Sequence, residues 1–415
     1  MTRATEMTKE GDRGMGRDNP LLQGLPLLGD LPDLDGASVL VRVDFNVPLR
    51  PCTGEPSMVT DDFRIRSALP TLEYLLAGGA RVTACTHLGR PAGAPDARWD
   101  LGPVREELAR LAPQVELLDN LRFDPGEEQN DPTFVEKLIN GHDAYVNDAF
   151  GVSHRKHASV VGPPSRLPSA AGFLLQHEIE AMGGLLGAPD RPFVAVVGGA
   201  KVADKLGVLK ALLNTVDALI VGGGMAFTFL AARGHHVGSS MVDLDRLPEC
   251  AALLASGKRI LLPTDIVALE PGANFGCDCT DGEVRIVGTE IPDGWRGLDI
   301  GPDTVEAYAR EIATARTVLW NGPMGVFEDG RFNAGTAGVA RAVADNTGFT
   351  VVGGGDSAAA VDELGLSDQI SFISTGGGAS LKLIEHGDLP GLAALRNAPN
   401  APPAGTVSRA PVERP

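Results

Sequence analysis

Glycine-rich turns in the second half of the chain have residue types that suit a phosphate group and a metal ion. In the run from Val351 to Ser357, β-branched residues stop at three glycines followed by Asp356 and Ser357. Glycines let backbone N–H groups approach an anion, a helix N-terminus adds partial positive charge, and the two side chains supply oxygen for Mg²⁺. A single turn of this kind could need glycine for geometry alone. Similar runs occur, however, at residues 196–201, 220–225 and 374–380.

These turns predict one ligand-binding edge. In an open parallel sheet all strand-to-helix turns lie at the carboxyl ends of the strands, where ligands bind. Neither familiar nucleotide fingerprint is present, because no Gly-x-x-x-x-Gly-Lys-Ser/Thr occurs and none of the runs has the spacing Gly-x-Gly-x-x-Gly. Protein-kinase signatures are missing too, since residues 154–156 lack the catalytic aspartate and no Asp-Phe-Gly occurs.

The first half contains a second group of residues that could bind an anion. Five basic side chains lie just beyond predicted strands: Arg64, His87, Arg90, Arg122 and Arg155. By the carboxyl-edge rule they should converge into a pocket for a phosphate or carboxylate ligand. Any one of them could be an ordinary charged residue on the surface. All five, however, lie at the same place relative to a predicted strand, which favours a shared pocket. His154 and His157 are expected to fix local loops rather than act in chemistry.

Length and composition limit the possible classes of protein. A chain of 415 residues is too long for one core and predicts two α/β domains. The net charge of -18 argues against a general binder of nucleic acid or membrane surfaces. No apolar run approaches the ~18 residues needed to span a bilayer. The first 28 residues resemble neither a secretory signal nor a transit peptide, so we expect a cytoplasmic protein that begins with a disordered leader or starts at Met7 or Met15.

The five cysteines are scattered and odd in number, which predicts reduced thiols. Cys277 and Cys279 form the only close pair, and without a second Cys or His pair nearby we expect no zinc site.

Strand-like and helix-like stretches alternate along the chain, which predicts mainly parallel sheets. The alternation predicts an α/β fold of two domains, each built on a mainly parallel sheet, with the boundary between them in a helix. The expected boundaries are a disordered leader at 1–28, a first domain at 29–175, the boundary helix at 176–187, a second domain at 188–396 and a disordered tail at 397–415.

Six of these motifs, taken together and in order, resemble the motif series of phosphoglycerate kinases. They are RVDFNVP (42–48), HLGRP (87–91), GAKVADK (199–205), GGGMA (222–226), WNGPMGVFE (320–328) and GGGDS (353–357). The resemblance runs from about Leu31 to Leu395. It implies a monomer of two doubly wound, Rossmann-like parallel-sheet domains joined by a hinge helix at 176–187, with 3-phosphoglycerate on the N-terminal domain and Mg-nucleotide on the C-terminal domain.

The resemblance also implies roles for individual residues. The phosphoglycerate would be held by residues of the first half: Asp44, Phe45, Asn46, Arg64, His87, Leu88, Gly89, Arg90, Arg122 and Arg155. ATP or ADP would be bound by residues of the second half: Lys201, Lys205, Gly222, Gly223, Gly297, Asn321, Pro323, Glu328, Gly354, Gly355, Asp356 and Ser357. Asp356 would ligate Mg²⁺, and the catalytic groups would be Arg64, Lys201, Gly354 and Gly355.

The implied reaction transfers a phosphoryl group between ATP and the carboxylate of 3-phosphoglycerate, as in glycolysis and gluconeogenesis. The carboxylate nucleophile is already ionised, so no general base is required, which agrees with a site of cations and backbone donors. The domains would close around the hinge helix and exclude water. No nucleic-acid or membrane partner is expected.

One residue departs from the family pattern: Lys382 stands where the family usually shows glutamate. This puts no catalytic group in doubt, but nucleotide affinity or a surface interaction could differ. Two alternatives stay open at this point. The chain could be a catalytically silent nucleotide binder with this fold, or an enzyme of similar architecture that acts on another acyl phosphate.

Overall fold

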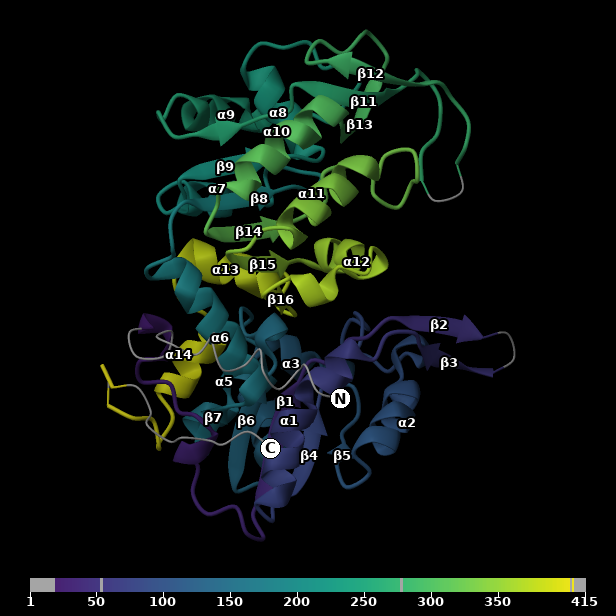
Figure 1. Cartoon of the computed structure of the whole chain (residues 1–415). Coiled ribbons are helices and arrows are strands. Elements are labelled where there is room, and N and C mark those ends of the chain that lie inside the picture. The colour runs from purple at the N-terminus through teal and green to yellow at the C-terminus, as the bar shows by residue number, and fades with distance from the viewer. Residues whose placement is uncertain (1–18, 53–54, 277–278, 404, 407–415) are drawn as a thin grey trace. The chain divides into compact units, whose positions relative to one another are not determined.

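The computed structural model describes residues 19–52, 55–276, 279–403 and 405–406. The chain divides into two compact units, Met1–Gly187 with His386–Pro415, and Ala188–Glu385. Each unit is built on a parallel sheet, so the predicted fold class of two doubly wound α/β domains is confirmed (Figure 1). Within the described residues, no helix is both long enough and apolar enough to cross a bilayer.

The sheet of the first unit has the strand order β5-β4-β1-β6-β7, and all of its pairs are parallel. Its strands are β1 (Ser38–Val43), β4 (Arg81–Cys85), β5 (Glu116–Leu117), β6 (Ala144–Asp148) and β7 (Ser169–Ala171). The order reverses direction between β1 and β6. Such a switch point opens a crevice at the carboxyl ends of the strands, where ligands bind.

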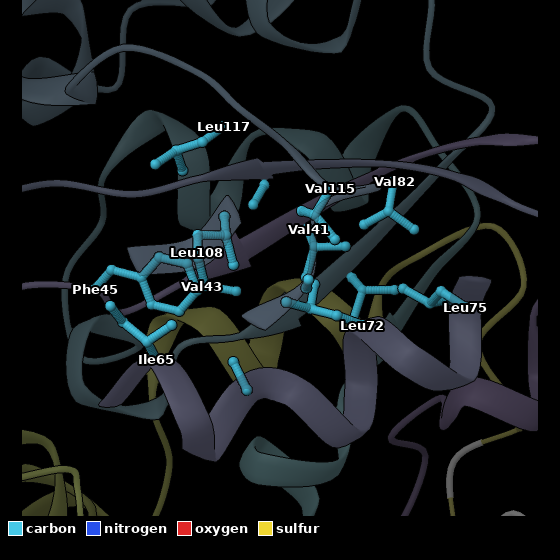
Figure 2. Packing of buried hydrophobic residues seen from close by; sticks show 14 of the residues in the cluster. Val41, Val43, Phe45, Ile65, Leu72, Leu75, Val82, Leu108, Val115 and Leu117 are labelled. Carbon is cyan, nitrogen blue, oxygen red and sulfur yellow. The ribbon is translucent and has the colours of Figure 1, made fainter. Parts of the chain in front are cut away.

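Apolar residues of β1 and α1 (Phe63–Ala77) build the core on one face of this sheet (Figure 2). Val39, Val41 and Val43 alternate along β1 and point to this face. They pack with Ile65 and Leu72 of α1, and α2 (Gly102–Leu111) adds further buried side chains. The apolar residues of α1 repeat every three or four positions, the spacing that places them on one side of a helix.

The remaining helices of the first unit are short, apart from α6. They are α3 (Pro125–Gln129), α4 (Pro132–Ile139), α5 (Ala158–Val161), α6 (Phe173–Leu186) and α14 (Pro390–Arg396). The Oδ1 atom of Asp148, the last residue of β6, accepts hydrogen bonds from the N–H groups of Leu174 and Leu175 and so caps the start of α6. A hairpin of β2 (Leu49–Cys52) and β3 (Glu55–Val59) completes the unit.

Three predicted boundaries differ from the structure. Residues 19–28 were predicted to be disordered, but Leu21, Leu25 and Leu28 are buried. Residues 386–396 belong to the first unit rather than the second, because α14 packs there and its Arg396 donates hydrogen bonds to backbone carbonyls at 21 and 23. Asn400, in the predicted disordered tail, donates to the carbonyl of Ser169. Residues 1–18 and 407–415 lie outside the described residues.

The sheet of the second unit has the order β10-β9-β8-β14-β15-β16, again parallel throughout. Its strands are β8 (Phe193–Val197), β9 (Ala218–Val221), β10 (Ile260–Leu261), β14 (Thr317–Asn321), β15 (Phe349–Gly353) and β16 (Phe372–Ser374). This is the strand order of dinucleotide-binding folds, and its switch point lies between β8 and β14.

Helices enclose the second sheet. They are α7 (Leu206–Leu212), α8 (Met225–Ala232), α9 (Leu247–Leu254), α10 (Pro302–Ala313), α11 (Ala334–Ala344), α12 (Gly355–Glu363) and α13 (Gly378–His386). On one face, Tyr308 of α10, Val339 of α11 and Val361 of α12 pack against Val194 and Trp320 of the sheet. A separate antiparallel sheet of β11 (Asp265–Leu269), β12 (Val284–Gly288) and β13 (Arg296–Ile300) was not predicted from the sequence.

Candidate active site

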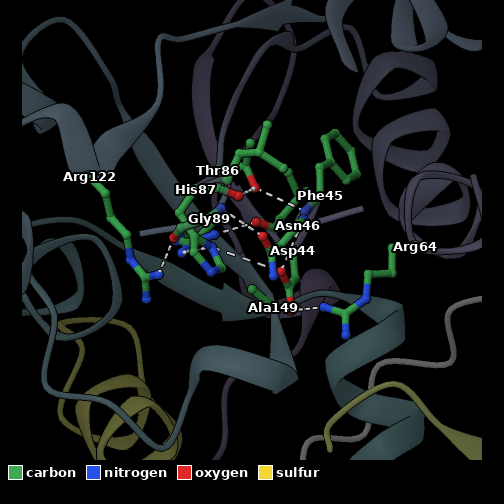
Figure 3. Close-up of polar contacts among 12 residues, drawn as sticks. Asp44, Phe45, Asn46, Arg64, Thr86, His87, Gly89, Arg122 and Ala149 are labelled. Atoms are coloured by element: carbon green, nitrogen blue, oxygen red, sulfur yellow. Dashed lines mark hydrogen bonds and ion pairs between the residues drawn. The ribbon is translucent and has the colours of Figure 1, made fainter. Parts of the chain in front are cut away.

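Two loops are joined at the carboxyl edge of the first sheet, one following β1 and the other following β4 (Figure 3). The N–H of Phe45 donates to Oγ1 of Thr86 over 2.9 Å, and the N–H of Gly89 donates to Oδ1 of Asn46 over 2.9 Å. Phe45 and Leu88 point into the core, where both are buried, so their side chains serve packing rather than ligand contact. These links hold the loops that carry the predicted binding residues in one place.

Arg64 and Asp44 form an ion pair at this edge. Arg64 is the second residue of α1, and its Nη1 lies 2.5 Å from Oδ2 of Asp44. A third of the Arg64 side chain stays exposed, at 34%. Arg64 is therefore held by a carboxylate while about a third of its side chain stays accessible, as a group that meets a ligand must.

Arg122 is the most unusual residue of the site, because it is buried without a full set of partners. Its side chain is 4% exposed, and its Nη1 donates to the carbonyl of Gly89 over 2.6 Å. Nε lies 3.2 Å from Oε1 of Glu128, but without hydrogen-bond geometry. Within the described residues, Nε and Nη2 of Arg122 and Nε of Arg155 are buried donors with no acceptor. Buried donors are nearly always satisfied in proteins, so these three call for an acceptor from outside the described residues, such as a water molecule or an anionic ligand.

Electrostatics at this edge favour an anion. Burial and the neighbouring charge of Arg155 lower the pKa of Arg122, although a guanidinium stays charged. Burial, followed by the charges of Arg42 and Arg122, holds the pKa of His87 well below its usual range. His87, counted from the sequence among the basic side chains of the pocket, is therefore expected to be a neutral ring at physiological pH, because it is 5% exposed and lies among arginines. Arg90, by contrast, is exposed.

The carboxyl edge of the second sheet is formed by glycine loops in close contact. A Cβ on Gly198 would lie 2.1 Å from the carbonyl oxygen of Pro323, and one on Gly222 would lie 2.4 Å from Sδ of Met324. Gly223 has a φ of +67°, and a Cβ there would lie 2.6 Å from the backbone N of Gly199. At these positions glycine is needed for packing between the loops after β8, β9 and β14.

Lys205 joins the two strands at the switch point of this sheet. Its Nζ donates to the carbonyl of Gly198 over 2.7 Å, to Oδ1 of Asn321 over 2.7 Å and to the carbonyl of Asn321 over 3.2 Å. Burial lowers the pKa of Lys205 to about 8, against the opposing influence of Asp356 and Asp204. All three ammonium protons have acceptors within the protein, so Lys205 would reach a phosphate only by exchanging one of them.

The start of α12 is open, unlike the glycine turns after β8 and β9, and so is the turn before α13, where a Cβ on Gly377 or Gly378 would meet no atom within 4 Å. Gly354 has a φ of +98°, and a Cβ on Gly355 would meet no atom within 4 Å. Asp356 is exposed in the first turn of this helix. Ser357 is fully buried, and its Oγ accepts a hydrogen bond of 2.6 Å from the N–H of Gly322. The Ser357 side chain therefore ties two loops together, and its expected phosphate contact stays a prediction.

This edge fits Mg²⁺ that arrives with a nucleotide. Across the described residues, no three His, Cys, Asp or Glu side chains gather to hold a metal by themselves. Asp356 offers one hard oxygen ligand beside open backbone donors. Mg²⁺ is commonly bound in this way, by one or two carboxylates together with substrate phosphates. Cys277 lies outside the described residues, so the expected absence of zinc at Cys277 and Cys279 stays a prediction.

The other predicted nucleotide residues differ in exposure. Lys201 and Glu328 are exposed, Pro323 is half-buried, and Gly297 is buried in β13. A Cβ on Gly297 would lie 2.4 Å from the ring of Phe227, so glycine is needed there for packing. Lys382, the departure from the family pattern, pairs with Glu385 on α13 over 2.7 Å.

Comparison with known proteins identifies the family. The family model described as phosphoglycerate kinase matches residues 28–117 and 109–387. The chain belongs to the phosphoglycerate kinase family. The phosphoglycerate kinase of Rubrobacter xylanophilus is 52% identical over 391 residues, which cover 88% of this chain and 96% of that protein. The phosphoglycerate kinase of Salinispora arenicola is 50% identical over 395 residues, covering 88% and 97%.

Solved structures agree with this assignment. Phosphoglycerate kinase from Coxiella burnetii has a TM-score of 0.77 at 35% identity, covering 88% of this chain and 97% of that one. Phosphoglycerate kinase from Pyrococcus horikoshii has the same TM-score at 31% identity, covering 90% and 99%. The predicted family resemblance is confirmed.

Three polar residues near the phosphoglycerate kinase motifs were not singled out from the sequence. Arg42, Glu127 and Ser159 are buried and hydrogen-bonded beneath the arginine cluster. One signal was available, because Arg42 interrupts an otherwise apolar strand. A charged residue at such a position is rarely tolerated unless it is paired.

Proposed function

We propose that this chain catalyses reversible, Mg²⁺-dependent phosphoryl transfer between ATP and the carboxylate of 3-phosphoglycerate. The observation that supports the acid site best is the set of buried guanidinium donors on Arg122 and Arg155 that lack an acceptor within the described chain. A phosphate or carboxylate would satisfy them with charge-assisted hydrogen bonds. Family membership supplies the identity of the acid.

In this proposal the first unit binds the acid. Arg122 and Arg155 hold its phosphate, and Arg90 and Asn46 complete the pocket. His87 contributes a neutral hydrogen-bond donor. Arg64, kept in place by Asp44, lies on the exposed side and offsets charge on the transferring group.

The second unit binds the nucleotide in this proposal. The open amides of Gly354 and Gly355 and the positive end of α12 attract the phosphates. Asp356 holds Mg²⁺, which would neutralise phosphate charge when bound. Lys201 stabilises the transferring group, Glu328 binds the ribose, and the residues near Gly297, Asn321 and Pro323 form the nucleoside pocket. Transfer requires the two units to approach, and we propose α6 as the hinge.

A coupled assay tests the proposal. The purified chain would be mixed with ATP, Mg²⁺ and 3-phosphoglycerate, and NADH oxidation through glyceraldehyde-3-phosphate dehydrogenase would be followed. Turnover that disappears in Lys201→Ala supports both reaction and site. If ATP binds but no turnover occurs, the chain is a silent nucleotide binder. Turnover only with another phosphorylated acid would assign a different substrate.

A further inference from the structure

Arg42 lies beneath the acid site and is almost completely buried. It is the fifth residue of β1, every residue of which is buried, and its own exposure is 1%. Val41 and Val43 point to the apolar core, so alternation along the strand directs Arg42 to the opposite face of the sheet. A guanidinium buried in such a place is strongly destabilising unless its nitrogens donate hydrogen bonds to acceptors in the protein.

The three nitrogens of this guanidinium each have an acceptor. Nε donates to Oγ of Ser159 over 2.9 Å, and Nη1 donates to the carbonyl of Val43. Nη2 lies 3.3 Å from Nδ1 of His87 in hydrogen-bond geometry. Arg42 therefore links the interior of the first unit directly to a predicted binding residue.

A buried carboxylate anchors the other end of this chain of hydrogen bonds. Ser159 donates its hydroxyl proton to Oε1 of Glu127 over 2.6 Å, and its N–H donates to Oε2 over 2.9 Å. Glu127 is 0% exposed, so it supplies the countercharge to Arg42 in a region away from water. Because Ser159 gives its only hydroxyl proton to Glu127, its oxygen is left to accept from Arg42.

The direction of the last bond determines the state of the histidine. Arginine has only donors, so Nδ1 of His87 must be the acceptor. A neutral imidazole that accepts at Nδ1 carries its proton on Nε2. The alternative, an Nδ1–H donating to Oδ1 of Asp44, is disfavoured because those atoms are 3.9 Å apart, beyond hydrogen-bond distance.

We propose that Arg42 is a positioning residue that fixes His87 as the neutral Nε2–H tautomer, so that the ring presents a hydrogen-bond donor to an oxygen of the bound acid. The identity of that acid rests on the proposed function, but the tautomer does not. Arg122, Arg155 and His157 also face this ring, and together with burial they oppose its protonation. A lone neutral donor suits a site whose charge is already supplied by arginines.

The tautomer can be measured without any substrate. The full chain would be labelled with ¹⁵N-histidine, and long-range ¹H–¹⁵N correlation spectra would be recorded from pH 5 to 8. The His87 signals are assigned by their loss in His87→Gln. We expect a protonated Nε2 and a bare, pyridine-type Nδ1 over this whole range. A proton on Nδ1, or a doubly protonated ring at pH 7, would overturn the proposal even if the enzyme is active.

Variants of Arg42 test the consequence for binding. Arg42→Met should let the His87 proton distribute over both nitrogens and raise KM for 3-phosphoglycerate about tenfold, with kcat within about threefold and KM for ATP unchanged. Arg42→Lys, which keeps a donor, should have a KM between those of Arg42→Met and the natural chain. The matched control is Arg98→Met, which removes an exposed arginine that is 79% exposed and paired with Asp96.

An Arg42→Met protein that keeps the Nε2–H tautomer, or that lowers kcat and leaves KM unchanged, would refute the positioning role. If Arg42→Met does not fold, as judged by circular dichroism, the spectrum of the natural chain decides the question alone.

Discussion

Replacing Arg122 by methionine should separate binding from stability in a way that an ordinary buried arginine would not. Methionine preserves most of the apolar stem and removes the guanidinium. That group has one hydrogen bond, from Nη1 to the carbonyl of Gly89, and two buried nitrogens without a hydrogen-bond acceptor, of which Nε lies 3.2 Å from the half-exposed carboxylate of Glu128. Each unsatisfied buried donor costs about 1–3 kcal/mol, whereas one hydrogen bond contributes about 1 kcal/mol. The free energy of unfolding should therefore be unchanged within about 1 kcal/mol, or higher.

The effect on the acid should be much larger. A charge-assisted hydrogen bond contributes about 1.5–3 kcal/mol, and two such bonds would be lost. Allowing for non-additivity, binding should weaken by about 2–4 kcal/mol, or about 30- to 1,000-fold in Kd. Urea unfolding would measure stability, and calorimetric titration with 3-phosphoglycerate would measure Kd. Arg98→Met is the matched control, with both quantities unchanged.

The opposite pattern would refute this reasoning. If Arg122→Met lowers the free energy of unfolding by more than about 2 kcal/mol and leaves Kd within threefold, the guanidinium is a structural group and does not bind the acid.

Three further predictions concern the catalytic groups, the glycine edge and the interior. Lys201→Ala and Arg64→Ala should each lower kcat by about 10²-fold or more with modest changes in KM, and steady-state kinetics showing a near-normal kcat would exclude the role. Gly223→Ala should destabilise the second unit by more than about 2 kcal/mol in thermal unfolding, because its φ is +67° and the added Cβ would lie 2.6 Å from the backbone N of Gly199. Gly234→Ala is the control for backbone strain alone, since Gly234 has a φ of +90° and no atom within 4 Å of an added Cβ. Burial raises the pKa of Asp148 to about 7, so between about pH 4 and 7 this carboxyl loses its proton in the unfolded chain but keeps it in the native chain. Its contribution to the free energy of unfolding therefore falls as pH rises. Asp148→Asn should remove that contribution and make the fall across this range smaller than in the natural chain, and parallel stability curves would contradict the prediction.

The fold was predictable because its signals are local and periodic. The valines alternate along β1, and the apolar residues of α1 recur every three or four positions, so each element has one apolar face. These two faces pack against each other in the core. The antiparallel sheet of β11 to β13 was missed because β12 is largely exposed and has no regular alternation of burial. The return of α14 to the first unit depends on contacts between residues more than 360 positions apart, such as Arg396 with the carbonyl of Leu21, which no local pattern encodes.

The site was predictable in outline but not in the role of each group. The carboxyl-edge rule predicts that Arg122 and His87 lie close together. Their burial, however, depends on tertiary packing, which the sequence pattern does not show. Burial leaves two nitrogens of Arg122 without an acceptor and lowers the pKa of His87. The glycine runs look alike in sequence. Gly222 is packed against Met324, whereas Gly355 faces open space, a difference that arises only from how the loops meet.

The most direct test of the central claim is whether a carboxyl group receives the phosphate. The chain would be incubated with ATP, Mg²⁺ and 3-phosphoglycerate in the presence of hydroxylamine, which converts an acyl phosphate into a hydroxamate. Our account predicts hydroxamate formed in step with ADP, dependent on the acid and lost in Arg64→Ala. Release of ADP without hydroxamate would mean that water or another group is the acceptor and would contradict the account.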